Sequence, residues 1–166
     1  MTLRIESLVK THWTSVSKIY AQGIKTGLAT FETEVPDWDT WNNKHIVSCR
    51  IVATINDVII GFGVLSPVSI RKVYEGVAEV TVYVAAAFRG QHIGEAILKQ
   101  LIIDSEAHGF WTLQAGIFSE NIASIELHKK CGFRIVGYRE KIGQLNGTWH
   151  NNHFLERRSK SNMLIK

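Results

Sequence analysis

The stretch RGQHIGEAIL, residues 89–98, comes soon after an alternating run, EVTVYV, at residues 79–84. Alternation of apolar and polar residues predicts a half-buried strand, and the apolar residues after the glycines predict a helix that runs to His108 and is capped by Gly109. The first turn of a helix has unpaired backbone N–H groups and the positive end of the peptide dipoles. A glycine turn between a strand and a helix therefore predicts an anion-binding site.

The length and composition predict one globular domain over residues 1–166. With 45% hydrophobic residues, the chain can bury one core but is too short for two ordinary domains. We expect the last about eight residues to form a polar tail. No run approaches the length of a membrane span, and the N-terminus lacks a signal-peptide core, so we predict a cytoplasmic protein without a membrane partner.

The cysteines and the charges exclude other classes of function. Cys49 and Cys131 have no CxxC or CxxH spacing, so no metal site and no disulfide framework is predicted, and both are expected to be buried thiols. The net charge is +4 and the isoelectric point is near 9.1, but the basic residues are scattered until RRSK at 157–160. We interpret that run as a solvated tail and predict no nucleic-acid partner.

The first half of the chain predicts two strands in a hairpin and two helices. A weak strand from Met1 to Glu6 precedes a helix capped by Thr11 and ending near Lys25. A loop over residues 26–36 is followed by a second helix, capped by Asp39 and ending near Ile46. The apolar runs 50–55 and 58–65 then flank Asn56-Asp57, which indicates a hairpin.

The second half predicts three more strands and a short helix. A strand covers residues 112–118, and a helix covers residues 121–131 with Gly132 at its end. Strands at 133–143 and 148–155 flank Asn146-Gly147, a strong hairpin signal. The predicted fold is an α/β (α+β) domain with a mixed sheet of six to seven strands and about four flanking helices.

A second segment, downstream of the glycine turn, helps to identify what the turn binds. The turn is neither the dinucleotide fingerprint GxGxxG nor a P-loop. However, RGQHIG together with NIASIELHKKCGF, residues 121–133, resembles the two signature segments of the GNAT superfamily of N-acetyltransferases. The resemblance implies the GNAT fold, acetyl-CoA as cosubstrate and a backbone cradle for its pyrophosphate. The cradle residues are Arg89, Gly90, Gln91, His92, Ile93, Gly94 and Glu95.

Three further pieces narrow the resemblance to one branch, and two positions depart from it. The pieces GLATFETE at 27–34, EVTVYV at 79–84 and GTWHNNHFLE at 147–156 look like the phosphinothricin and methionine sulfoximine or sulfone N-acetyltransferases. His92 stands where the family usually has glycine, and either keeps the same backbone conformation or changes how phosphate is held. Asn151 stands where relatives usually carry aspartate, and this difference affects which acceptor is expected rather than which reaction.

Two residues are candidates for the proton transfers that acetylation of an amine requires. A carboxylate partly buried in a sheet can have a raised pKa, and the resemblance implies that Glu79 is the catalytic base. A pairing of Glu79 with a basic neighbour is the alternative. His128 occupies the place of a general acid toward the thiolate and could donate or relay a proton, or it could be a packed helix residue.

The resemblance also assigns binding residues on either side of the reaction. Val82, Tyr83 and Val84 match the strand whose backbone binds the pantetheine arm and polarises the thioester carbonyl. Asn121 and Ser124 match positions near the pantetheine or phosphate, although Asn121 could only cap its helix. The expected acceptor-binding residues are Phe31, Glu32, Arg71, Lys72 and Tyr74, of which the charged ones could instead belong to solvated loops.

These expectations define one main function and two alternatives. The main hypothesis is direct transfer of acetyl, in a ternary complex, to the α-amino group of phosphinothricin, methionine sulfoximine, methionine sulfone or a similar small molecule. The alternatives are acetylation of another amine, such as a protein N-terminus or polyamine, and a non-catalytic acyl-CoA sensor. The resemblance also implies a homodimer with the loop TFET near a shared site. Trp38, Trp41, Trp111 and Trp149 are expected in the core or in an interface.

Overall fold

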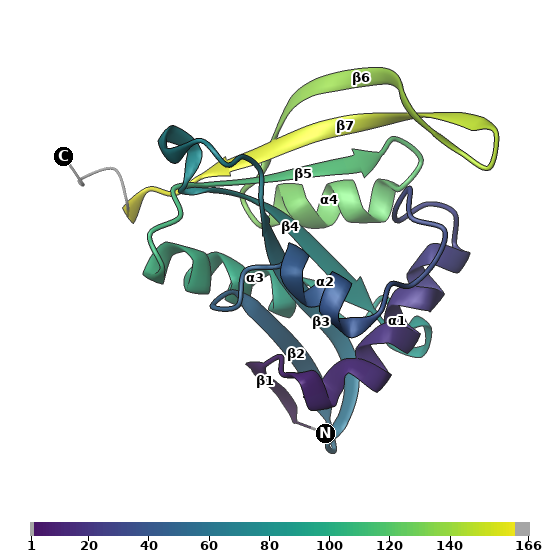
Figure 1. Cartoon of the computed structure of the whole chain (residues 1–166), viewed down its shortest axis with the longest axis vertical. Helices are drawn as coiled ribbons and strands as arrows, with labels where there is room; N and C mark the ends of the chain where they lie inside the picture. The colour runs from purple at the N-terminus through teal and green to yellow at the C-terminus, as the bar shows by residue number, and fades with distance from the viewer. Residues whose placement is uncertain (1, 162–166) are drawn as a thin grey trace.

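The computed structural model describes residues 2–161, which form a seven-stranded mixed sheet in the order β1-β2-β3-β4-β5-β7-β6 (Figure 1). The strands are β1 (Leu3–Ser7), β2 (Arg50–Ile55), β3 (Val58–Pro67), β4 (Val77–Val84), β5 (Thr112–Phe118), β6 (Arg134–Leu145) and β7 (Thr148–Arg158). In the described chain only β4 and β5 pair in parallel. The predicted fold class is confirmed.

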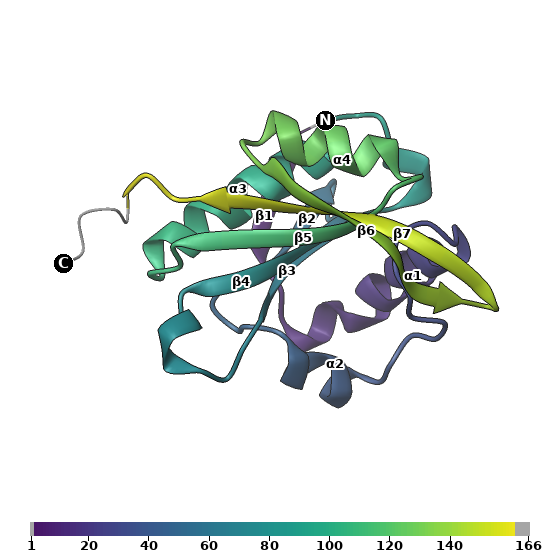
Figure 2. The ribbon, with the colours of Figure 1, turned by 90° about the horizontal axis from the view of Figure 1, so that it is seen from above.

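Four α-helices cover the two faces of the sheet. Figure 2 shows α3 and α4 on one face and α1 and α2 on the other. Their bounds are α1 (Trp13–Lys25), α2 (Trp38–Lys44), α3 (Ile93–Ala107) and α4 (Ile122–Lys130). Short 3₁₀ turns, η1 (Lys10–His12), η2 (Lys72–Tyr74) and η3 (Ala86–Phe88), precede α1, β4 and the cradle.

Each face of the sheet has its own apolar core. The side chains of Ile97, Leu98 and Leu101 on α3 are fully buried against the sheet. A Cβ on Gly63 of β3 would lie 2.5 Å from Ile97, so the absence of a side chain there lets α3 lie close to the strand. On the other face, Trp41 is 3% exposed in a second cluster. Burial of such side chains, about 1.5–3 kcal/mol each, fixes α3 and thereby the glycine turn before it.

The hairpins follow the local sequence signals. Asn56 and Asp57 both have positive φ angles, 51° and 63°, as the favoured two-residue turn requires. Asn146 and Gly147, at 48° and 81°, repeat this between β6 and β7. Gly109 also has the predicted left-handed conformation, with φ 83°. These predictions are confirmed.

Two predicted helix caps are wrong. Thr11 lies inside η1, and α1 begins after His12 without a side-chain cap. The cap of α2 is Asp37, whose carboxylate accepts a hydrogen bond of 2.7 Å from the Thr40 N–H, whereas Asp39 lies in the first turn. Both caps were placed from residue type, and the backbone geometry of the preceding segment selects a different residue.

The structure shows where the first residues of the predicted tail and the two cysteines lie. The interpretation of residues 157–160 as a solvated tail is wrong for the first three of them, because β7 continues to Arg158 and the buried Ser159 donates its N–H to the Trp111 carbonyl, just before β5, at 2.8 Å. Residues 162–166 of the predicted tail lie outside the described residues. Cys49 and Cys131 are buried free thiols.

A fork between β4 and β5 positions the functional site. The two strands pair only from Val77↔Thr112 to Glu79↔Gln114, while β4 continues to Val84 and β5 to Phe118. Beyond that last pair, each strand is paired only on its other side. The backbone groups that face the fork are therefore available to a ligand.

Candidate active site

Glu79 lies where the fork opens, and its environment favours proton transfer. The Glu79 side chain forms a hydrogen bond with the side chain of Gln114, the residue opposite it in the last pair of β4 and β5. One side of the Glu79 side chain is exposed to the cavity. Removal from water raises the pKa of Glu79 above its ordinary value, and the Gln114 hydrogen bond and the Arg139 charge oppose this rise. A carboxylate with a raised pKa is a better proton acceptor than an ordinary surface glutamate.

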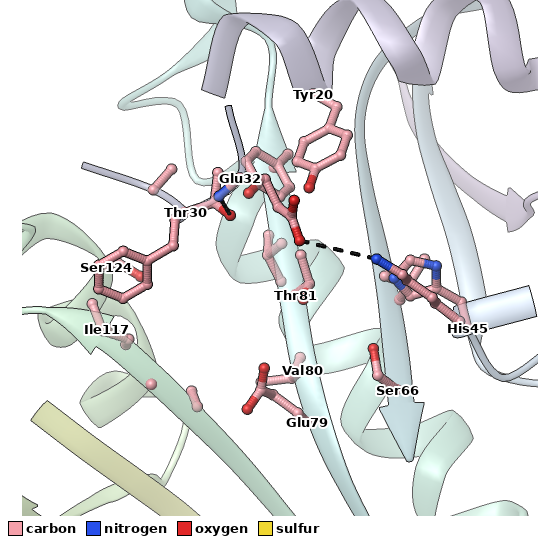
Figure 3. Close-up of a pocket in the computed structure, with 18 of the residues that line it drawn as sticks. Tyr20, Thr30, Glu32, His45, Ser66, Glu79, Val80, Thr81, Ile117 and Ser124 are labelled. Atoms are coloured by element: carbon pink, nitrogen blue, oxygen red, sulfur yellow. Dashed lines mark hydrogen bonds and ion pairs between the residues drawn. The ribbon is translucent and has the colours of Figure 1, made fainter. Parts of the chain in front are cut away.

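A cavity of about 830 Å³ extends from Glu79 along β4 and β5. In Figure 3, Glu79 and Thr81 of β4 lie between Ile117 and Ser124 on one side and His45 and Ser66 on the other. Phe31 and Glu32 of the loop before α2 also line this cavity, and their role in acceptor binding stays a prediction. The cavity has the size of a small-molecule site.

A second cavity, of about 620 Å³, lies at the start of α3. Most of the predicted cradle lines it, namely Arg89, Gly90, His92, Ile93, Gly94 and Glu95, whereas Gln91 does not. The two cavities share the lining residues Leu28, Ala29, Val82, Tyr83, Asn121 and Ser124. The fork is therefore the meeting point of two adjoining cavities, with Glu79 in one and the glycine turn in the other.

The cradle keeps the backbone conformation that an anion site needs. Gly90 has a φ of 75°, and His92 adopts the left-handed region with φ 61° and ψ 10°. The His92 side chain is 79% exposed and provides no cap to the helix, so the first N–H groups of α3 have no side-chain partner. The substitution of histidine for glycine thus preserves the turn, and the residues present fit a pyrophosphate held by N–H groups.

The carboxylate of Glu95 forms ion pairs with the lysines near the cradle. Its carboxylate bonds with Lys130 at 2.6 Å and with Lys99 at 2.7 Å, and His92 lies 3.3 Å away. The hydrogen bonds from Lys130 and Lys99 lower the pKa of Glu95 to about 2. Arg89, which also lies at the cradle, takes no part in these ion pairs. Its Nε donates a hydrogen bond to the Val84 carbonyl at 3.3 Å.

His128 is buried at the wall of the first cavity. It is 4% exposed, and its Nδ1 donates to the Ser124 carbonyl at 2.7 Å, because a carbonyl oxygen only accepts. Desolvation lowers the pKa of His128, while that hydrogen bond opposes the shift. The neutral ring therefore carries its proton on Nδ1 and keeps Nε2 as an acceptor.

Asn121 and Asn151 have structural partners. Asn121 caps α4 by accepting from the Ser124 N–H at 3.2 Å, and its amide nitrogen donates to the Leu28 carbonyl at 3.2 Å. Asn151 does not line the first cavity, and its Oδ1 accepts from the Lys141 N–H at 2.7 Å at an irregularity in β6. Asparagine thus supplies a carbonyl acceptor at the position where the resemblance led us to expect a carboxylate.

Three predicted acceptor-binding residues lie away from both cavities. Arg71, Lys72 and Tyr74 belong to η2 and the residue before it, and Arg71 lies over the Tyr74 ring at 5.4 Å. Their role in acceptor binding stays a prediction.

Sequence reasoning missed several residues that line the first cavity. They are Tyr20, Thr30, His45, Arg139 and Asn152. Thr30 forms hydrogen bonds with Tyr20 and Tyr83, which joins α1, the loop and β4. The hairpin of β6 and β7 was predicted from Asn146-Gly147, but the register that places Arg139 opposite Asn152 was not.

The described chain has neither a membrane span nor a cluster of metal ligands. Between residues 2 and 161 no helix is long and apolar enough to cross a membrane. Over the same residues, no three His, Cys, Asp or Glu side chains are grouped so that they could hold a metal ion.

Comparisons with known proteins agree with this geometry. The model of the acetyltransferase (GNAT) family matches residues 15–133. A phosphinothricin N-acetyltransferase of Alcaligenes faecalis is 30% identical over 150 residues, which cover 86% of this chain and 76% of the relative. An L-methionine sulfoximine/L-methionine sulfone acetyltransferase of Salmonella typhimurium is 25% identical and covers 94% and 93%.

A solved structure has the same fold with the cosubstrate bound. The phosphinothricin acetyltransferase of Sinorhizobium meliloti, crystallised in complex with acetyl-CoA, has a TM-score of 0.88 and 26% identity. The match covers 100% of this chain and 93% of that one.

The ion pairs of Glu95 predict a pH dependence of stability. The carboxyl has a pKa of about 2 in the folded state and roughly 4.3 when unfolded, so its stabilisation is present above pH 4.3 and is lost as the pH falls toward 2. Glu95→Gln should lower the free energy of unfolding at pH 7, and the deficit should shrink by pH 3. Urea unfolding at both pH values measures this.

A matched control is Glu126→Gln, which removes one exposed ion pair with Lys129 and should change stability little. A deficit of Glu95→Gln that is equal at pH 7 and pH 3 would contradict the assigned ion pairs.

Proposed function

Because the chain belongs to the GNAT family of acetyl-CoA-dependent N-acetyltransferases, we propose that its acceptor is the α-amino group of a small amino-acid-like molecule. The observation that carries the proposal is the pair of cavities that meet at the fork, with Glu79 on one side and the N–H cradle on the other. Bound acetyl-CoA would supply an activated acetyl group at that meeting point. The acceptor would approach through the cavity lined by Phe31 and Glu32.

Glu79 would act as the base for the incoming ammonium. An ammonium group must lose a proton before its nitrogen can attack, and Glu79 would take that proton directly or through water. The backbone of Val82, Tyr83 and Val84 would orient the reacting carbonyl by hydrogen bonding at the fork. Both reactants would be held together, as direct transfer in a ternary complex requires.

His128 would transfer the second proton. When the nitrogen bonds to the acetyl carbon it releases another proton, and Nε2 of the neutral His128 would accept it. Nε2 of His128 would then donate that proton to the leaving sulfur. His128 thereby returns to its neutral form, and the proton that Glu79 took from the ammonium would pass to water.

The relatives support an amino-acid-like acceptor, and two alternatives remain to be tested against it. Matched relatives are named for phosphinothricin, methionine sulfoximine and methionine sulfone. The alternatives are another amine, such as a protein N-terminus or a polyamine, and an acyl-CoA sensor without turnover. The Glu79 carboxylate at the fork favours catalysis over sensing. Location in the cytoplasm stays a prediction.

The test of the function is release of CoA thiol from acetyl-CoA in the presence of different amines. We expect release with phosphinothricin, methionine sulfoximine or methionine sulfone above the no-amine control. Ordinary amino acids, polyamines and a peptide N-terminus complete the panel. Release with polyamines or the peptide alone would replace the proposed acceptor, and no release with any amine would favour the sensor.

Glu79→Gln tests the proposed base. The change keeps the shape and the bond to Gln114 but removes the proton acceptor, so kcat/KM should fall by about 10²–10⁴-fold. Acetyl-CoA should still raise the melting temperature. In the unmodified enzyme kcat/KM should decrease with falling pH at a pKa above that of an ordinary glutamate. Equal turnover by the variant would remove Glu79 from the mechanism.

The predicted homodimer has a candidate surface on β6. This strand is an edge of the sheet, and Ile135, Val136, Tyr138 and Ile142 of β6 and Trp149 of β7 are exposed apolar residues. Sedimentation should give about twice the chain mass of 18.7 kDa, and Ile142→Lys should shift the protein toward the monomer. A monomer at high concentration would contradict the homodimer.

A further inference from the structure

Arg139 brings a positive charge to the acceptor side of the fork. It lines the first cavity, and its guanidinium carbon lies 4.2 Å from the centre of the Phe154 ring. Its charge is close enough to Glu79 to oppose the rise in the pKa of that carboxyl. The cavity therefore presents a cation on β6 across from the proposed base on β4.

Asn152 adds an amide beside that cation. It pairs directly with Arg139 across β6 and β7 and with Phe118 across β5 and β7. Asn152 is 7% exposed, and within residues 2–161 its buried Oδ1 has no hydrogen-bond partner. A buried carbonyl oxygen without a partner is unfavourable for folding, so packing alone does not account for Asn152 at this position.

The orientation of the Asn152 amide indicates which of its atoms a ligand would contact. A Cβ added to Gly116 would lie 3.2 Å from Asn152 Nδ2, so the amide nitrogen lies over a position of the cavity wall that has no side chain. The carbonyl oxygen is turned into the protein. Because Asn152 and Arg139 are direct cross-strand partners, the amide N–H donors and the guanidinium donors lie on one face of the sheet.

We infer that Arg139 and Asn152 bind the carboxylate of the amino-acid acceptor, with Glu79 facing its amine. This inference rests on the proposed function and adds the residues that would recognise an α-amino acid rather than a simple amine. Guanidinium and amide N–H groups together match the two oxygens of a carboxylate. The Glu79 carboxylate lines the same cavity and favours the ammonium, whereas Glu32 is already paired with Lys44 at 4.0 Å.

The placement of other residues supports this assignment. Arg71 and Lys72, the two cations among the expected acceptor-binding residues, line neither cavity. The Asn151 hydrogen bond to Lys141 N–H fixes the irregularity in β6 just after Arg139. The recognition pair is therefore built into the two strands and does not depend on the movement of a loop.

The test compares L-methionine sulfone with 3-(methylsulfonyl)propylamine, the same molecule without the carboxylate. We expect the unmodified enzyme to prefer the amino acid in kcat/KM. Arg139→Gln and Asn152→Leu should each reduce this preference by about tenfold, mainly through a higher KM for methionine sulfone. Asn152→Asp should reduce it further, because a carboxylate there repels the carboxylate of the acceptor. Each of the three variants should lower kcat/KM for methionine sulfone more than kcat/KM for the propylamine.

Two controls separate recognition from stability. Arg134→Gln changes another arginine of β6, which pairs with Glu156 outside the first cavity, and should keep the preference. Asn152→Leu should keep or raise the melting temperature of the ligand-free protein, since a buried oxygen without a partner is removed. Asn151→Leu should lower it, because that amide has a partner.

The outcomes distinguish this inference from the proposed function. If both acceptors are acetylated equally well, or if Arg71→Gln rather than Arg139→Gln removes the preference, the carboxylate site is wrong while the acetyltransferase stands. A lower melting temperature of Asn152→Leu with an unchanged preference would also overturn it. If the unmodified protein acetylates neither these nor any other amine, both proposals fall.

Discussion

The end of the β4–β5 ladder at Glu79 and Gln114 is the constraint on which the rest of the site depends. Parallel pairing stops at this pair, although both strands continue. Had the ladder continued, the backbone groups of Val82 and Val84 would be paired with β5 and the two cavities would be separated by sheet. The fork instead exposes backbone to a ligand at a defined place, with a carboxylate at its closed end.

The features predicted from sequence are those that depend on neighbouring residues. The turns at Asn56-Asp57 and Asn146-Gly147 need only local φ angles, and the end of α3 at Gly109 needs only one left-handed residue. The signature segments likewise predicted the family, because RGQHIG encodes a backbone shape. Helix starts were less predictable, since Thr11 and Asp39 have suitable side chains but the wrong backbone position.

Two residues of the first cavity were beyond sequence reasoning for a physical reason. Arg139 and Asn152 come together through the register of β6 on β7, and that register shifts twice within β6. A shift by one residue turns a side chain to the other face of the sheet, so alternation alone does not tell which residues reach the cavity. The hydrogen bond from Lys141 to Asn151 that fixes one shift joins residues ten apart and has no signature in the sequence.

The charge balance around the glycine turn has a consequence for the behaviour of the protein in solution. Glu95 neutralises two lysines, so the cradle would hold a pyrophosphate through fixed N–H dipoles and Arg89 instead of a group of mobile cations. Attraction between mobile surface charges weakens as added salt shortens the Debye length, whereas short hydrogen bonds to oriented backbone groups are screened much less. Affinity for the cosubstrate should accordingly be tolerant of ionic strength, in spite of the basic isoelectric point of the chain.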